Sequence, residues 1–65
     1  METYTFTMKG KTFELMVINR TILIDAELHI QGRQIPLAIN SFPIDTDIRD
    51  IIHWAEHLMK SHVQS

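Results

Sequence analysis

The segment from His53 to His57, which reads HWAEH, carries the residue types of a metal-dependent hydrolase. In the pattern H-x-x-E-H, two histidines bind zinc and the glutamate activates a water molecule. On a helix, both histidines would lie opposite an apolar stripe centred on Ala55 and would face solvent. A catalytic zinc also needs a third protein ligand and a dry cleft, and the chain offers only His29 and His62 as further histidines. We interpret the pair as solvent-facing histidines, with a zinc-dependent hydrolase as the remote alternative.

No other group of residues predicts catalysis. The chain has no cysteine and no glycine-rich phosphate loop, and neither Ser41 nor Ser61 has a histidine and an acid near it in the expected topology. Glu14, Asp25 and Glu27 could form a cation site or a docking site for a basic partner. The simpler interpretation is that they are solvated surface carboxylates without a specific role. We expect no catalytic residue, no bound metal and no cofactor, so the chain is predicted not to be an enzyme.

The length and composition indicate a single small domain spanning residues 1–65, with a net charge of −2. A chain of this size buries only about 60% of its surface on folding, so a monomer is marginally stable. Without cysteines, oligomerisation is the usual further source of stability. The opening segment METYTFTM is unlike a secretion signal, and no apolar run approaches the roughly 20 residues of a membrane span. We expect a cytoplasmic protein.

Alternation of apolar and polar residues predicts four β-strands, near residues 2–8, 11–18, 21–30 and 33–40. Turn-compatible residue pairs separate these strands, which predicts hairpin loops at Lys9–Gly10, Asn19–Arg20 and Gln31–Gly32. With these loops, the apolar side chains of all four strands fall on one face. The sequence therefore predicts a four-stranded antiparallel meander of order 1-2-3-4.

The same loops predict which residues stand opposite one another. The expected pairs are Tyr4 with Leu15, Phe6 with Phe13, Phe13 with Ala26, Leu15 with Ile24, Ile24 with Ile39, Ala26 with Leu37, and Leu28 with Ile35. In this register Pro36 lies on the outer side of an edge strand. A residue without an amide N–H is tolerated there and discourages pairing with another chain.

The segment that follows predicts a helix over about residues 46–61. Asp45 and Thr46 are favourable N-cap residues, and Lys60 and His62 suit the negative end of the helix dipole. Apolar residues recur at three- and four-residue spacing, at Ile48, Ile51, Ile52, Ala55, Leu58 and Met59. This stripe is expected to pack on the apolar face of the sheet, so the predicted fold class is α+β, a two-layer ββββα domain.

The opposite face of the sheet is predicted to be polar and acidic. It places Glu14 across from Asp25, and Met16 across from Leu23. No aromatic or cationic side chain is expected on it, which does not favour nucleic-acid binding. Three basic residues gather near two loops at one end: Lys9, Lys11 and Arg33. They keep a small nucleic-acid-associated protein as the alternative function.

The remaining surfaces predict binding to another protein. The candidate partner-binding residues are Thr3, Thr5, Thr7, Met16, Ile18, Leu23 and Trp54. The threonines lie on the unprotected edge of the first strand, and Trp54 is either a rim residue of the core or an anchor. Met16, Ile18 and Leu23 form an apolar patch on the exposed sheet face, and stacking of two such faces is the second choice for self-association. We expect a non-catalytic protein-interaction module that forms a homodimer through the first strand. Its size is that of an accessory or inhibitor protein of a phage or mobile element, or of a small bacterial regulator.

Replacement of His53 and His57 together by Ala is expected to leave the free energy of unfolding nearly unchanged, because solvent-facing side chains contribute little to packing. Chemical denaturation of the wild type and the double variant measures this difference. Stoichiometric zinc that copurifies with the wild type and is lost in the double variant would contradict the interpretation.

Overall fold

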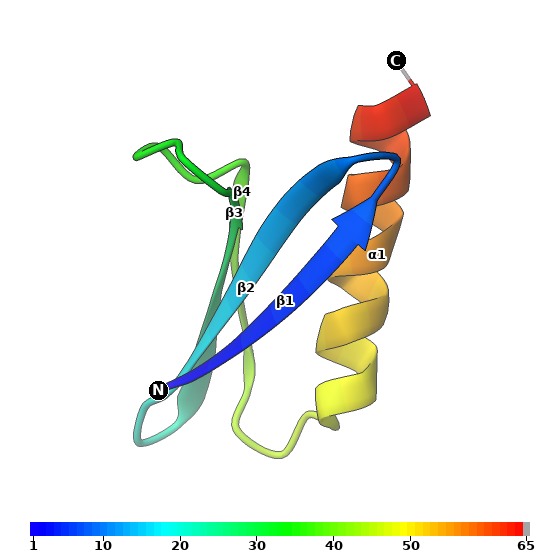
Figure 1. Ribbon diagram of the computed structural model, residues 1–65. Coiled ribbons are helices and arrows are strands. Elements are labelled where there is room, and N and C mark those ends of the chain that lie inside the picture. The colour runs from blue at the N-terminus through cyan, green and yellow to red at the C-terminus, as the bar shows by residue number, and fades with distance from the viewer. Residues whose placement is uncertain (65) are drawn as a thin grey trace.

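The computed structural model describes residues 1–64 and contains four strands and one helix (Figure 1). The elements are β1 (Glu2–Met8), β2 (Lys11–Asn19), β3 (Leu23–Ile30), β4 (Ala38–Pro43) and α1 (Ile48–Gln64). The strands form one antiparallel sheet in the order β1-β2-β3-β4, and α1 covers one face of it. The predicted ββββα fold of class α+β is confirmed.

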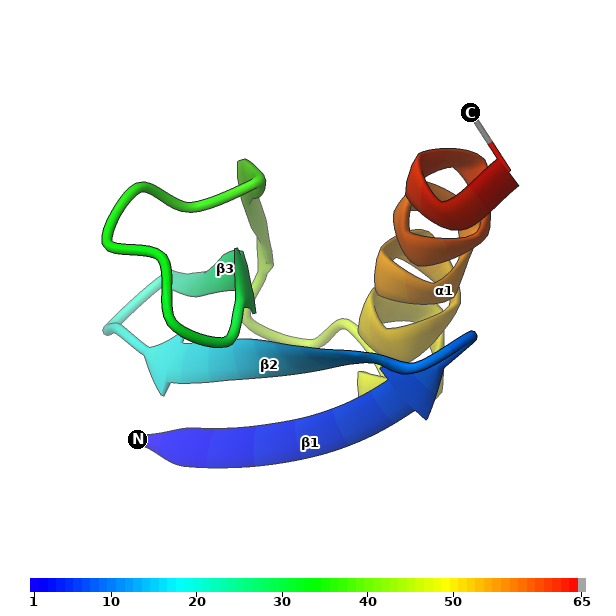
Figure 2. The ribbon, with the colours of Figure 1, turned by 45° about the horizontal axis from the view of Figure 1, so that its top comes forward.

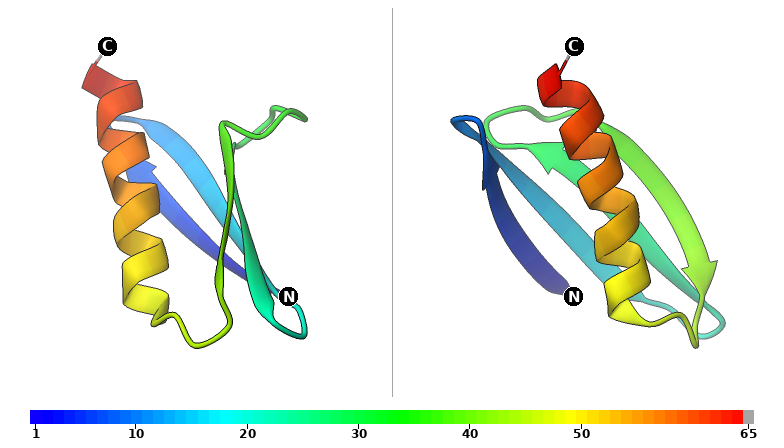
Figure 3. Two further views of the ribbon diagram at one scale, coloured as in Figure 1. Left: turned by 180° about the vertical axis from the view of Figure 1, so that it is seen from behind. Right: turned by 90° about the vertical axis from the view of Figure 1, so that its right-hand side faces the viewer.

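The core lies between α1 and the inner face of the sheet (Figure 3). Within residues 1–64, nine apolar residues are buried: Phe13, Leu15, Val17, Ile24, Ala26, Leu28, Ile51, Ala55 and Met59. The three from α1 belong to the predicted apolar stripe. The backbone of α1 approaches β1 and β2 most closely, and Asn40 on the inner face of β4 is exposed. The helix therefore covers the sheet unevenly and leaves part of β4 open.

The first hairpin has the predicted turn and register. Lys9 and Gly10 have φ angles of 50° and 78°, and two positive values in succession are typical of the tight turns that match the twist of a hairpin. Glycine adopts such a φ at no steric cost, whereas Lys9 does so under mild strain. Phe6 stands opposite Phe13, as predicted.

The second turn lies further along the chain than predicted. The predicted loop at Asn19–Arg20 is wrong, because β2 extends to Asn19 and the N–H of Arg20 donates to the carbonyl of Leu23 at 2.7 Å. The chain reverses at Thr21 and Ile22, neither of which has a positive φ. These residues lack the glycine or asparagine signal on which the prediction depended.

The register between β2 and β3 is consequently shifted by four residues, since Leu15 stands opposite Leu28 and not Ile24. The other observed inner-face pairs are Phe13 with Ile30, Val17 with Ala26, and Asn19 with Ile24. An even shift keeps each strand's apolar side chains on the same face. The observed register sets Leu28 opposite Leu15, whereas the predicted register would set Leu28 opposite Lys11.

The fourth strand also begins later than predicted. Gln31 and Gly32 do form a turn, in which Gly32 has a φ of 89° and the N–H of Arg33 donates to the carbonyl of Ile30 at 3.0 Å. This turn does not lead directly into a strand, because residues 31–37 form a loop, so the predicted strand near 33–40 is wrong. Pro36 lies in this loop and not in an edge strand. Ile35, which was predicted to lie in the core, is 82% exposed.

The register of β4 against β3 is shifted by three residues, since Ile24 pairs with Phe42 and not with Ile39. An odd shift exchanges the two faces of a strand. Ile39 therefore points to the outer face and is 64% exposed, and the predicted pairing of Ala26 with Leu37 is wrong because Ala26 faces Asn40. The observed register instead places Phe42 on the inner face, where its aromatic side chain is half-buried against the core.

The helix is displaced slightly toward the C-terminus relative to the predicted residues 46–61. Oδ1 of Asp47 accepts a hydrogen bond from the N–H of Arg49 at 2.9 Å, so Asp47 is the N-cap and not Asp45 or Thr46. In the described part of the chain, residues 1–64, α1 lacks the length and the apolar character that a membrane-spanning helix requires.

The observed registers predict unequal effects of the same substitution on stability. Ile24→Val is expected to lower the free energy of unfolding by about 1 kcal/mol, because it removes a buried methylene. Ile35→Val and Ile39→Val are expected to change it by less than about 0.5 kcal/mol, because both side chains are exposed. Urea denaturation of the three variants measures this. Equal losses for Ile24 and Ile39 would contradict the observed register of β4.

Candidate functional site

β1 forms one edge of the sheet, and in the described part of the chain no other segment runs along its outer side (Figures 2 and 3). Residues of an antiparallel pair alternate between hydrogen-bonded and non-bonded positions. The two-residue turn makes Met8 and Lys11 a bonded pair, so bonded positions recur at every second residue of β1. The residues between them, Thr3, Thr5 and Thr7, therefore direct their N–H and C=O groups away from the sheet.

The opposite edge of the sheet is β4. The N–H of Ile44 donates to the carbonyl of Ile22 at 3.2 Å, and this bond fixes which β4 residues face β3. By the same alternation, the backbone groups that point away from the sheet belong to Ile39, Ser41 and Pro43.

Two of these three positions on β4 offer no free amide donor. The N–H of Ser41 donates to Oδ1 of Asn40 at 2.9 Å. Pro43 has no N–H, so it blocks this edge in the way that was predicted for Pro36. β1 contains neither a proline nor a lysine among Glu2–Met8. The two edges of the sheet are therefore protected to very different degrees.

Aromatic surface lies beside the β1 edge on the inner face. Tyr4 and Phe6 are only half-buried, although both pack against the core. A further strand placed against β1 would cover the exposed flanks of both rings, which is a favourable use of large apolar side chains.

The other sheet residues predicted to bind a partner lie on the outer face. The side chains of the three β1 threonines are exposed, Met16 and Ile18 are half-buried, and Leu23 is exposed. The predicted pairing of Met16 with Leu23 is wrong, because Met16 faces Glu27 and Leu23 faces Pro43. The apolar patch expected here is therefore interrupted by a carboxylate.

A polar network organises one part of the outer face. The predicted pairing of Glu14 with Asp25 is wrong, because Glu14 stands opposite His29. Asp25 instead accepts hydrogen bonds from Nε of Arg20 at 3.0 Å and from Oγ of Ser41 at 2.9 Å. The hydrogen bond from Arg20 is the main cause of a lowered Asp25 pKa, and the bond from Ser41 adds to it.

A second polar pair lies further along β3, where Nε2 of His29 is 3.0 Å from Oε1 of Glu27. His29 is only 16% exposed and places a ring on a face where no aromatic or cationic side chain was expected. Two of the three outer-face carboxylates, Asp25 and Glu27, thus have partners within the chain. Within residues 1–64 no three potential metal ligands lie together.

Trp54 and the two helix histidines occupy different surroundings. Trp54 is half-buried and packs edge-to-face on Phe42, with ring centroids 5.7 Å apart. It thereby joins β4 to α1 at the rim of the core, and its binding to a partner stays a prediction. His53 and His57 are both exposed, as the helical spacing predicted.

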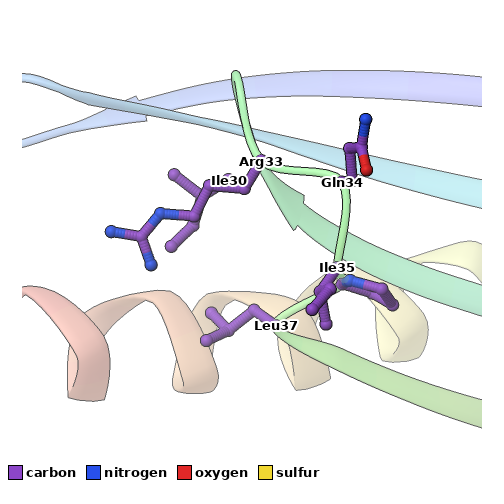
Figure 4. A pocket seen from close by; sticks show the side chains of 6 residues that line it. Ile30, Arg33, Gln34, Ile35 and Leu37 are labelled. Atoms are coloured by element: carbon purple, nitrogen blue, oxygen red, sulfur yellow. The ribbon is translucent and has the colours of Figure 1, made fainter.

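The sequence did not predict a groove at the end of the molecule that carries the β3–β4 loop. A hollow of about 550 Å³ lies within the loop, and a second hollow of about 250 Å³ adjoins it beside α1. Leu37 lines both hollows. Figure 4 shows the side chains of Ile30, Arg33 and Leu37 extending to the same side, and Leu37 is the one that shares a hollow with α1. We call this feature the loop–helix groove, and its main lining residues are Ile30, Arg33, Leu37, Leu58, Ser61 and His62.

Comparisons with protein-family models, with curated proteins and with solved structures find no match to this chain. The class of protein is therefore defined by its fold, a two-layer ββββα domain with one protected and one unprotected sheet edge. Inferences about its function depend on the chemistry of these edges and of the loop–helix groove.

Arg20→Gln is expected to raise the pKa of Asp25 toward its ordinary value of 3.8, because the hydrogen bond from Arg20 is the largest cause of the lowered pKa. NMR titration of the side-chain carboxyl groups measures the change. Since the pKa is lower in the folded state, the stabilisation is present above about pH 4 and is lost as the pH falls through the folded-state pKa. Arg49→Gln is the control, because it should raise the pKa of Asp47 and leave that of Asp25 unchanged.

Proposed function

We propose that this chain is a non-catalytic protein-interaction module that forms a homodimer by pairing β1 with β1 of a second copy. The observation that carries the proposal is the contrast between the two sheet edges. β1 directs backbone groups of three residues outward, whereas the Asn40 side chain and Pro43 protect β4. Natural sheets usually protect an exposed edge, and an edge left open is a template for strand addition.

An antiparallel pairing centred on Thr5 matches the outward-facing positions of both copies. Thr5 stands opposite the partner's Thr5, and Thr3 stands opposite the partner's Thr7, so every outward N–H and C=O of β1 meets a complementary group. About six backbone hydrogen bonds would form between the copies. The two four-stranded sheets would become one continuous sheet with both helices on the same face, and a twofold axis closes the assembly.

The side chains support the same arrangement. On the inner face, Tyr4 would stand opposite the partner's Phe6, which covers the exposed flanks of both rings. The antiparallel direction also places the turn that carries Lys9 and Lys11 beside the partner's Glu2, so opposite charges lie near each other at both ends of the pairing.

Stacking of two outer faces is a less favourable route to a dimer. It would bring Glu14, Asp25 and Glu27 of both copies together, with the cost of removing carboxylates from water. The interrupted apolar patch around Met16 offers little area to offset this cost.

Thr5→Pro is expected to convert a dimer into a monomer. Proline removes the N–H at the centre of the proposed pairing in both copies, and it breaks no bond within the chain because this N–H points away from β2. Analytical ultracentrifugation at tens of micromolar protein detects the change, since association of about −7 kcal/mol is evident at such concentrations.

Ile39→Pro is the matched control, because it removes an outward N–H from the β4 edge and should leave association unchanged. Thr5→Lys is a second test that keeps the backbone donor and sets two like charges opposite each other across the twofold axis. Circular dichroism shows whether each variant is folded. A wild-type chain that sediments as a monomer at tens of micromolar contradicts the homodimer, and equal association of Thr5→Pro and wild type contradicts the β1 pairing.

A further inference from the structure

Charge is distributed unequally between the two ends of the molecule. The β1–β2 turn, the β3–β4 loop and the C-terminal part of α1 lie together at one end (Figure 1). Residues 8–12, 30–37 and 57–64, which form this end, contain no Asp or Glu. They contain four of the chain's six Lys and Arg residues: Lys9, Lys11, Arg33 and Lys60.

The remaining two cations lie toward the opposite end, and each is paired with a carboxylate. Arg20 contacts Asp25, and Arg49 contacts Asp47, both at 3.0 Å. The basic end is different, because within residues 1–64 no ion pair joins any of its four Lys and Arg residues to a carboxylate. A surface of this kind attracts anionic groups of a partner.

The loop–helix groove opens at this basic end and has an aliphatic floor. Ile30, Leu37 and Leu58 supply the floor, and Arg33 extends beside Ile30 and Leu37 (Figure 4). Lys60 lines a further hollow on α1, which shares Ser61 with the groove. Exposed large apolar side chains that flank a concave surface are typical of a binding site, and Ile35 on the loop is 82% exposed.

Lys11 extends the positive charge to the side of the groove. Its Nζ lies 3.4 Å from Nε2 of His62, a groove residue that also packs edge-to-face on Phe13. With Lys11 as the donor, Nε2 of His62 is the acceptor, so the contact places an ammonium group beside the aliphatic floor.

We propose that the loop–helix groove binds a peptide segment of another protein in which apolar side chains alternate with Asp or Glu. The apolar side chains would lie on the aliphatic floor, and the carboxylates would reach Arg33, Lys60 and Lys11 at the rim. This inference rests on the proposed function as a protein-interaction module and names the chemistry of its partner. It does not require the β1 pairing, because the groove lies between the β3–β4 loop and α1 and remains open when β1 is paired.

Other occupants fit the groove less well. Single-stranded nucleic acid is bound through aromatic side chains on which bases stack, whereas the floor here is aliphatic. The acidic end of a second copy, with Ile44 and Asp45, has complementary chemistry, but a head-to-tail contact does not close and leads to open chains. These occupants are distinguished by the experiment.

The experiment uses NMR spectra of the ¹⁵N-labelled chain and three synthetic probe peptides of equal length. The first alternates Leu with Glu, the second alternates Leu with Lys, and the third alternates Ser with Glu. The Leu/Glu peptide is expected to shift the amide signals of Arg33, Leu37, Leu58 and Lys60. The other two peptides are expected to bind at least roughly tenfold more weakly, because each lacks one of the two required groups. Added salt should weaken the binding of the Leu/Glu peptide.

Substitutions locate the binding. Arg33→Gln and Lys60→Gln are each expected to lower the affinity for the Leu/Glu peptide several-fold, because each removes a positive charge. Leu37→Ser is expected to lower it to a similar degree, because it removes an apolar contact. Arg20→Gln is the matched control, because it removes one positive charge from the opposite end and should leave the affinity unchanged. Equal weakening by Arg20→Gln would show that net charge alone controls binding and would overturn the proposal.

Three further outcomes would also overturn it. The first is the absence of amide shifts at millimolar Leu/Glu peptide. The second is that oligo-dT or anionic vesicles bind at the same residues more tightly than the Leu/Glu peptide does. The third is that a peptide with the sequence of residues 41–50 of this chain binds more tightly than the Leu/Glu peptide. Repeating the titration with Thr5→Pro separates the two proposals. If the wild type is a monomer and still binds the Leu/Glu peptide, only the proposal of β1 pairing is contradicted. If the wild type is a dimer that depends on β1 and does not bind the Leu/Glu peptide, only the proposal for the groove is contradicted.

Discussion

The pairing of β2 with β3 is the constraint on which the rest of the structure depends. β2 is bonded on both sides and supplies Phe13, Leu15 and Val17 to the core, so β1 and β3 are both aligned against it. With Leu15 opposite Leu28, the apolar residues of β3 stand against those of β2 and form with them the surface on which α1 packs. The register of β4 is set separately, by the packing of Phe42 against the core and against Trp54, and the loop of residues 31–37 results from the late start of this strand.

The periodicity of the sequence was sufficient to predict the fold but not the registers. Alternation assigns residues to faces, and it is unchanged when one strand slides along another by two or four positions. Only the turn distinguishes such slides, and Thr21 and Ile22 carry no turn signal. For β4, either of two alternating sets of residues could face the core, one with Ile39 and the other with Phe42. In the observed set Phe42 contacts Trp54, and a local sequence pattern does not reveal a contact between residues in different elements.

The sequence likewise predicted some features of the candidate binding surfaces and not others. The β1 edge was predicted because Lys9–Gly10 is a strong local turn signal that fixes which residues face outward. The sequence predicted that a proline protects the other edge, but it named Pro36. The protection comes from Pro43 and from the Asn40 side chain. The groove was missed because the residues of its loop, including Arg33 and Leu37, had been assigned to a strand. The spacing of Gly32 and Pro36 was the available signal that this segment is a loop.

The meander topology also has a consequence for how the chain folds. Every strand pairs with its neighbour in sequence, so the sheet can form by closing short loops, and a single hairpin forms in roughly 1–10 μs. The helix follows the sheet in the chain and is synthesised after it. A nascent sheet that still lacks α1 exposes an uncovered apolar face beside an open edge, which is the combination most prone to aggregate. Docking of α1 therefore covers the apolar face, and the β1 edge is the part of this surface that stays open afterwards.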